Sequence, residues 1–107
     1  MQLGNNRQRI KFIKMNKIYI SGKITGDDNF KKKFKVAESK LRKSGWRIIA
    51  NPTSFPAALT WEAYMIQDIR ELFTCDAIFM IDDWKESKGA KIEHAIALNC
   101  NKLIIYG

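Results

Sequence analysis

The stretch DAIFMIDDWKESKGAKIEHAIALNCNKLIIY, residues 76–106, contains the pattern that decides the fold of this chain. An apolar run at 76–81 leads through a polar turn into a helix of about a dozen residues capped by Ser87, and a second apolar run follows at 102–106. Short strands that are apolar throughout are typical of a parallel sheet covered on both faces, and the helix between them forms the crossover. The stretch therefore predicts a parallel strand-helix-strand unit.

The same alternation of strand and helix occurs upstream of this unit. Strands are predicted at 17–20 and 46–50. The helix between them has the apolar positions Phe30, Phe34, Ala37 and Leu41. A second helix, capped by Thr60, follows the second strand and has the apolar stripe Trp61, Met65, Ile69, Leu72 and Phe73. With right-handed crossovers, this order predicts an α/β fold. We expect a doubly wound, open parallel sheet of about four strands in the order 2-1-3-4, with helices on both faces.

A chain of 107 residues, 46% of them hydrophobic, is long enough for one domain with a single core. We expect residues 1–14 to form a basic, flexible extension and residues 15–107 to form the domain. Because we find no run of about 18 apolar residues and no secretory signal, we predict a cytoplasmic protein without membrane contact. Cys75, Cys100 and His94 are too few for a disulfide framework or a zinc site, so we predict neither a metal nor a cofactor.

The net charge of +8 raises the question of a nucleic-acid partner. Residues 1–14 contribute +4, because they contain four basic residues and no acid. Much of the remaining charge lies at 31–47, where Glu38 is the only acid. The spacing of Phe30 and Phe34 fits a core stripe better than a base-stacking surface, and we interpret the neighbouring lysines as a solvated helix face. Nucleic acid is therefore the least favoured partner.

An open parallel sheet binds ligands outside the carboxyl ends of its strands, at the point where the winding direction reverses. This rule selects the loops at 21–28 and 82–89. The first contains SGKITG, whose backbone N–H groups and lysine can contact a phosphate, although glycines at such turns also occur for steric reasons alone. The candidate binding residues of this loop are Ser21, Gly22, Lys23 and Gly26.

The second loop leads into a helix that carries a glutamate near its start. With Ser87 as the N-cap, Gly89 and Ala90 fall in the first turn. Glu93 follows on the same helix edge, between the small residues Ala90 and Ala97. Beside this row, the predicted apolar face consists of Ile92, Ala95 and Ile96. A carboxylate bracketed by small residues leaves room for a substrate, while the alternative is a solvated glutamate favoured by the helix dipole.

Three further residues have two interpretations each. Asp68 lies beside the apolar stripe of the second helix, where it either caps a local polar group or faces the ligand cleft. Tyr19 is close to the carboxyl end of the first strand, and its hydroxyl either reaches the cleft or is satisfied in the core. Trp84 either covers a ligand or closes the core.

Three segments carry a family resemblance. They are KIYISGKITG at 17–26, DIRELFTCD at 68–76 and WKESKGAKIEHAIA at 84–97. In these segments the chain resembles the small nucleoside 2-deoxyribosyltransferase-like proteins, and among them the short phage and bacterial branch known as the DUF4406 family. The resemblance covers residues 17–107 and implies a flavodoxin-like sheet and cleavage of an N-glycosidic bond.

The resemblance also implies roles for individual residues. Glu93 matches the glutamate that attacks the anomeric carbon of a nucleoside, and Asp68 matches the acid that helps to protonate the departing base. Tyr19 matches the tyrosine that orients the nucleophile. Ser87 matches the hydroxyl residue that holds a 5′-phosphate in related nucleotide hydrolases, whereas the transferases have an aspartate at this position.

We therefore expect an enzyme acting on nucleosides or nucleoside 5′-monophosphates, which transfers a ribosyl or deoxyribosyl group to a base or to water. Its expected site comprises Glu93, Asp68 and Tyr19, with Ser21, Gly22, Lys23, Gly26, Trp84, Ser87, Gly89 and Ala90 as binding residues. A homodimer or larger homo-oligomer is expected, because a neighbour helps to close a shallow cleft. The alternatives are a catalytically weak nucleotide-binding or sensing module and a basic nucleic-acid-binding protein.

Overall fold

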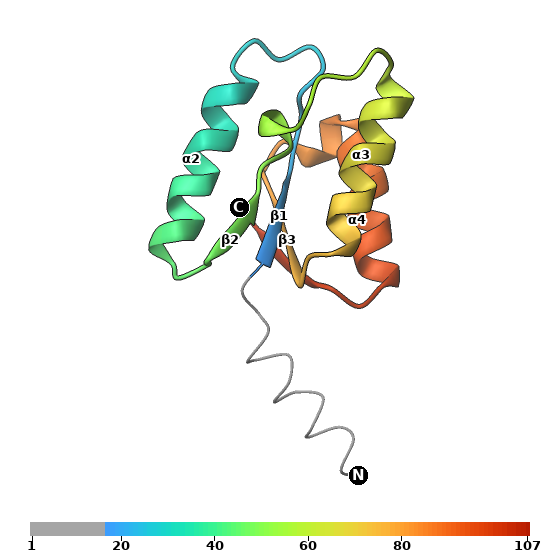
Figure 1. The fold of residues 1–107 in the computed structure, drawn as a ribbon. Helices are drawn as coiled ribbons and strands as arrows, with labels where there is room; N and C mark the ends of the chain where they lie inside the picture. Colours follow the sequence, from blue (N-terminus) through green and yellow to red (C-terminus); the bar gives the residue numbers. More distant parts are fainter. Residues whose placement is uncertain (1–16) are drawn as a thin grey trace.

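A computed structural model describes residues 17–107, so the predicted extension at 1–14 lies outside the described residues. Four parallel strands form one open sheet in the order β2-β1-β3-β4 (Figure 1). The predicted α/β fold and strand order are therefore confirmed. Across the described part of the chain, the helices are too short or too polar to span a membrane.

Each predicted strand and helix is present, with small changes at the ends. The strands are β1 (Lys17–Ser21), β2 (Ile48–Ala50), β3 (Ala77–Met80) and β4 (Leu103–Tyr106), and the helices are α2 (Phe30–Lys43), α3 (Trp61–Phe73) and α4 (Lys88–Asn99). Short 3-10 helices, η1 (Pro52–Ser54) and η2 (Trp84–Glu86), lie in two loops. β1 extends beyond its predicted end because Ser21 pairs with Met80 of β3. β2 is shorter than the predicted 46–50, since only its last three residues pair with β1.

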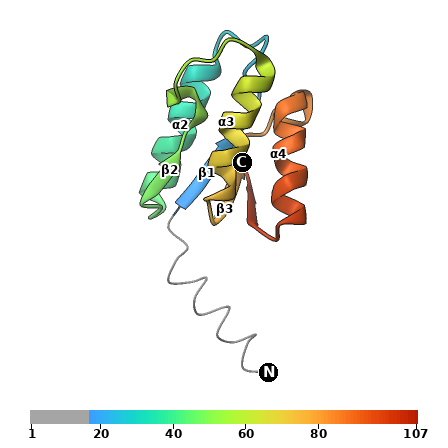
Figure 2. The same cartoon turned by 45° about the vertical axis from the view of Figure 1, so that its right-hand side comes forward.

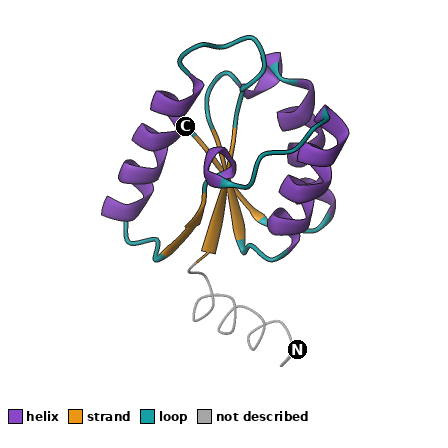
Figure 3. Cartoon of the chain, turned by 45° about the horizontal axis from the view of Figure 1, so that its top comes forward, coloured by secondary structure: helices purple, strands orange, loops and turns teal. Residues whose placement is uncertain are grey.

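One face of the sheet packs against α2 (Figure 3). The helix buries Phe34, Ala37 and Leu41, whose spacing places them on one side of the helix. From the sheet, the same cluster contains Ile18, Ile20, Ala77 and Phe79. All these buried side chains are apolar, so this layer is stabilised by hydrophobic burial.

The opposite face packs against α3 and α4, which lie side by side (Figures 1 and 2). Its apolar cluster includes Tyr19, Leu72, Ile78, Met80, Ala90 and Ala97. Unlike the α2 layer, this layer also buries the polar side chains Ser21, Asp68 and Glu93. The polar groups that define the candidate site therefore lie on one side of the sheet.

The predicted apolar faces of α3 and α4 are wrong in part. Trp61 and Phe73, at the two ends of α3, are exposed. On α4, Ala95 is exposed and Ile92 and Ile96 are half-buried, while the row of Ala90, Glu93 and Ala97 is buried instead. Because the alanine side chains are small, α4 packs close to the sheet, and hydrogen bonds satisfy the Glu93 carboxylate between them. A pattern of hydrophobic residues alone does not reveal this arrangement. Of the two cysteines, Cys75 is buried and Cys100 is exposed.

Candidate active site

A cleft of about 480 Å³ opens at the carboxyl end of β1. Its walls come from β1, the start of α2, the segment around η1, and the first turns of α3 and α4. The volume is within the range of about 300–1,000 Å³ that is usual for small-molecule sites. The cleft therefore lies where the sequence placed the ligand, at the point where the winding direction reverses.

Glu93 lies at the base of this cleft, with 4% of its surface exposed. Tyr19 Oη donates a hydrogen bond of 3.0 Å to Glu93 Oε2, and Ser21 Oγ donates one of 2.7 Å to Oε1. Tyr19 and Ser21 are two positions apart on β1, so both side chains point to the same face of the sheet. Each carboxylate oxygen of Glu93 therefore has its own donor. The interpretation of Glu93 as a solvated residue is wrong.

Asp68 is the second carboxyl group of the cleft, with 8% of its surface exposed. It lies on the buried face of α3 between Met65 and Leu72. Thr60 caps α3, and within residues 17–107 no protein group donates a hydrogen bond to the Asp68 carboxyl. Of its two interpretations, the structure therefore supports a carboxyl that faces the cleft.

Burial changes the protonation of both carboxyl groups. It raises the pKa of Asp68 to about 7 and that of Glu93 to about 8, where the negative charge of Asp68 adds to the rise and the hydrogen bonds from Ser21 and Tyr19 oppose it. The pKa of Tyr19 lies well above its usual value, first because of burial and then because of the charges of Glu93 and Asp68. Tyr19 therefore remains a hydrogen-bond donor, and between about pH 7 and 8 the carboxyl pair passes through a state with one proton.

The first turn of α4 forms another wall of the cleft. Ser87, Gly89 and Ala90 all line it, and Ser87 Oγ accepts a hydrogen bond of 3.1 Å from the Ala90 N–H. A Cβ atom at position 89 would lie 3.0 Å from Met65 Sδ and 3.9 Å from the Trp61 ring, so the glycine keeps this wall open. The positive end of the helix dipole favours a negatively charged ligand group here.

The loop after β1 divides into residues that line the cleft and residues that do not. Gly22 lines it, and a Cβ atom there would lie 2.9 Å from Ile81 Cβ, which explains the need for glycine. Lys23 lies outside the lining: its N–H donates to Asp83 Oδ1 at 3.1 Å, and its Nζ lies 3.5 Å from Glu86. Gly26 also lies outside the lining and has a positive φ of 78°, which a turn requires.

A lysine of α2 joins the two loops that the sequence selected. Lys33 pairs with Asp27 of the first loop and with Asp83 of the second. Its side chain is only partly exposed, so the prediction that the lysines at 31–35 form one solvated face is wrong at this position. The pairs hold both loops beside the start of α2.

Trp84 also lies outside the cleft lining. Its ring stacks on His94, with centroids 4.1 Å apart, and lies tilted against Tyr106 at 6.2 Å. His94 Nε2 and Tyr106 Oη are 2.8 Å apart. Of the two interpretations of Trp84, the structure supports the one in which it closes the core near η2.

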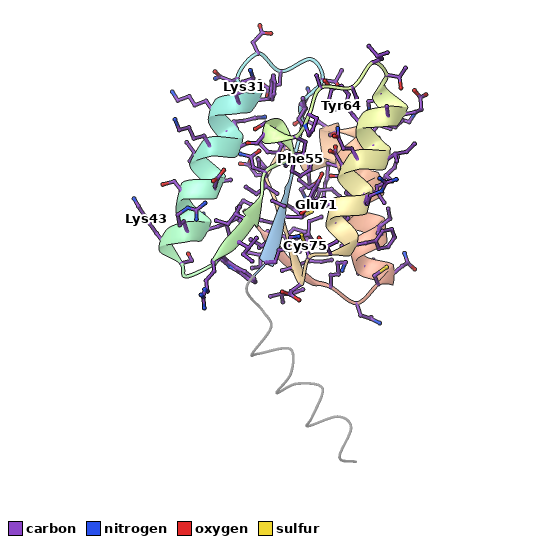
Figure 4. All side chains as sticks on the ribbon, in the orientation of Figure 1. Lys31, Lys43, Phe55, Tyr64, Glu71 and Cys75 are labelled. Carbon is purple, nitrogen blue, oxygen red and sulfur yellow. The ribbon has the colours of Figure 1, made fainter. Side chains whose placement is uncertain are left out.

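Sequence reasoning missed an aromatic and cationic part of the cleft. Phe55, Trp61 and Tyr64 line it, and so does Lys31 in the first turn of α2. Figure 4 shows Phe55 between α2 and α3. The segment at 51–59 looked like a connection because it holds both prolines, and the phenylalanine between them was the available sign of a binding role. In the described part of the chain, no group of three His, Cys, Asp or Glu side chains is placed to bind a metal ion.

The fold and site define an open parallel α/β protein with two buried carboxyl groups in a cleft at the carboxyl edge of its sheet. A family model described as a domain of unknown function, DUF4406, matches residues 16–106, and the chain belongs to this family. This match confirms the DUF4406 part of the resemblance. A search of the curated proteins finds no match. The wider link to nucleoside 2-deoxyribosyltransferase-like proteins stays a prediction.

Proposed function

We propose that this protein is a cytoplasmic enzyme that cleaves the N-glycosidic bond of nucleosides or nucleoside 5′-monophosphates through a covalent glutamyl-sugar intermediate. The observation that carries the proposal is the buried Glu93 carboxylate, held at both oxygens by Tyr19 and Ser21 in a cleft that also contains Asp68. Burying two carboxyl groups in a small domain is costly, and such pairs are concentrated at functional sites.

In the first step, a Glu93 oxygen attacks the anomeric carbon of the sugar. The bond from this carbon to the base nitrogen breaks, its electron pair goes to the base, and Asp68 donates the proton that the base needs to leave. The reaction uses the form of the pair in which Glu93 is ionised and Asp68 holds the single proton. The two hydrogen bonds to Glu93 favour this form, whereas the deeper burial of Glu93 favours the form in which Glu93 holds the proton. The division of labour follows the logic of retaining glycosidases, with one nucleophile and one acid.

In the second step, water or an acceptor base attacks the anomeric carbon and the bond to Glu93 breaks. Asp68, now ionised, accepts the proton that the attacking water or base loses. Transfer and hydrolysis therefore use the same residues and differ only in the second nucleophile. Tyr19 and Ser21 act as positioning residues, because both hold the Glu93 carboxylate in one orientation.

Binding of the substrate is supported by two walls of the cleft. The first turn of α4, with Ser87, Gly89 and Ala90, suits a 5′-phosphate or a sugar hydroxyl. On the other side, Phe55 and Tyr64 offer aromatic surfaces on which a base can pack. A neighbouring subunit that covers this cleft stays part of the proposal, and light scattering that gives the mass of a monomer would remove it.

The experiment is incubation of the purified protein with a panel of nucleosides and nucleoside 5′-monophosphates, with and without an acceptor base. Chromatography then measures free base and any new nucleoside. We expect release of base from at least one panel member and none from a Glu93→Gln protein. If the wild type binds nucleotides and cleaves none, the protein is instead a nucleotide-binding module on this fold.

A further inference from the structure

A second hollow of about 660 Å³, more open than the cleft, runs along α2. We call it the basic groove. It lies between one side of α2 and the segment at 51–54, which contributes Asn51, Thr53 and Ser54. Its charged lining residues are Lys31, Lys35, Glu38, Arg42 and Lys43. Lys31 and Thr53 line both the basic groove and the cleft, so the two hollows adjoin each other.

The basic groove has an excess of positive charge. Arg42 pairs with Glu38 at 2.9 Å, and Glu38 also accepts a hydrogen bond of 3.0 Å from Asn51. These donors lower the pKa of Glu38, so its carboxylate stays ionised and paired with Arg42 and Asn51. Among the residues at 17–107, Lys31, Lys35 and Lys43 form no ion pair, in contrast to Lys33 on the same helix. These lysines therefore bring three positive charges to the lining of one groove, and the charge of Lys35 also acts on Glu38.

The two hollows differ in charge. The cleft contains Glu93 and Asp68 and favours a negative ligand group only at the first turn of α4, while the basic groove attracts anions along its length. A ligand with an uncharged glycosyl part and an anionic tail is therefore oriented with its sugar and base in the cleft. Lys31, on the border, is placed to contact the first phosphate of the tail.

The length of the basic groove indicates how long an anionic ligand must be to contact all of its basic residues. Lys31 and Lys43 lie at opposite ends of α2 (Figure 4). At 1.5 Å per residue, they are about 18 Å apart along the helix axis. A single phosphate or a triphosphate reaches only part of this distance. A nucleic-acid strand stacked as in a duplex, with about 3.4 Å per nucleotide, presents about five phosphates over the same length, and a more extended single strand presents fewer but still several.

We infer that the basic groove binds the phosphate backbone of a single-stranded oligonucleotide whose terminal nucleoside occupies the cleft. The position of that nucleoside rests on the proposed function, whereas the backbone contact does not. Lysine ammonium groups and the hydroxyls of Ser39, Thr53 and Ser54 contact phosphates without reading bases. The sequence alone ranked nucleic acid last, because the spacing of Phe30 and Phe34 fits a core stripe and the neighbouring lysines fit a solvated face. Only the structure shows that three of these lysines line a groove beside the cleft.

The test is binding of fluorescent single-stranded DNA and RNA of about eight nucleotides to the full chain, measured by anisotropy over a salt titration. Lys35→Gln/Lys43→Gln removes two charges from the basic groove without touching the cleft lining. Lys32→Gln/Lys91→Gln removes two exposed charges that line neither hollow. Both variants keep the basic residues at 1–14, so any contribution of that segment cancels.

We expect the groove variant to bind the oligonucleotide about tenfold more weakly with a shallower salt dependence, and the control variant to stay within about twofold of wild type. Lys35→Arg/Lys43→Arg should restore binding. A nucleoside monophosphate should bind equally well to all variants, because its phosphate does not reach Lys35. The inference is overturned if wild type does not bind the oligonucleotide, if both charge-removing variants lose affinity equally, or if the monophosphate loses affinity as much as the oligonucleotide.

Binding in the basic groove is independent of turnover. A Glu93→Gln protein is used alongside wild type in every binding measurement, and loss of base release in it does not affect the backbone contact. If oligonucleotides bind through the basic groove and no panel member is cleaved, the proposed function fails and this inference stands. Cleavage of mononucleotides without groove-dependent oligonucleotide binding supports the proposed function and overturns this inference.

Discussion

Helices cover both faces of the sheet, α2 on one and α3 with α4 on the other, and the two faces differ in the side chains that they bury. Toward α2, the core cluster is apolar, with Ile20, Phe34 and Leu41 as examples, and the buried Asn51 lies at its edge, where it binds Glu38. Toward α3 and α4, buried apolar groups surround Glu93 and Asp68. A strand alternates its side chains between the faces, so β1 supplies both environments from neighbouring residues.

The difference between the faces indicates that the α2 side mainly stabilises the fold, while the α3 and α4 side holds the reactive groups. An apolar layer gains free energy from each buried side chain, whereas a buried carboxyl group costs free energy unless hydrogen bonds or a proton compensate it. Tyr19 and Ser21 compensate Glu93 in part, and the raised pKa values of Glu93 and Asp68 show that the compensation is incomplete. The α3 and α4 side therefore carries a cost that the proposed reaction explains.

The largest expected effect is on the polar side. Glu93→Gln keeps the shape of the side chain and removes the anionic oxygen that bonds to the sugar. Base release should fall by about 10⁴-fold or more while ligand binding is largely kept, as measured by chromatography and by titration calorimetry. Turnover close to that of wild type would eliminate the covalent mechanism.

Asp68→Asn tests the other carboxyl group of the same face. An amide cannot donate the proton that the base needs, so release should fall by about 10²–10⁴-fold for bases that are poor leaving groups. Bases that leave easily should be affected less. The comparison of rates across the panel checks this, and an equal loss for every base would contradict the role of Asp68 as the acid.

Leu41→Ala tests the apolar face. The side chain is 3% exposed, packs in the α2 layer and does not line the cleft. Its truncation should lower the free energy of unfolding by about 2–5 kcal/mol, measured by urea denaturation, because it removes buried surface and leaves a cavity. Base release per folded molecule should be unchanged. A large loss of activity in the folded fraction would show that the two faces are not independent.

The smallest expected effect is the change in stability between about pH 7 and 8. Burial raises the pKa of Glu93 from 4.5 to about 8 and that of Asp68 from 3.8 to about 7, so the native state binds more protons than the unfolded state between these limits. Stability should therefore fall as pH rises through this window, by about 1.4 kcal/mol per pH unit between about pH 7 and 8, where one extra proton is held, and about twice as steeply below pH 7, where two are held. Urea denaturation at several pH values measures the slope.

The control for this slope is the double variant Glu93→Gln/Asp68→Asn. Because neither replacement ionises, the fall in stability with rising pH should flatten. If the double variant shows the same slope as wild type, groups other than Glu93 and Asp68 cause the pH dependence of stability. The rate of base release should show a maximum between about pH 7 and 8, where the pair holds one proton.

The sequence by itself determined the order of strands and helices. Apolar runs at 17–20 and 76–81 and the helical spacing of Phe30, Phe34 and Leu41 are local patterns, and right-handed crossovers leave few ways to assemble them. Because ligands of such sheets bind at the carboxyl edge, the sequence also predicted the position of the cleft.

Only the tertiary structure decided which polar groups meet. The hydrogen bonds from Tyr19 and Ser21 to Glu93 join residues more than seventy positions apart, and the burial of Asp68 depends on how α3 packs. Likewise, Lys31 contributes to both hollows only because α2 lies beside the segment at 51–54. Local patterns record which face of an element is apolar, but the position of a side chain in a cleft follows from the packing of several elements that are distant in sequence.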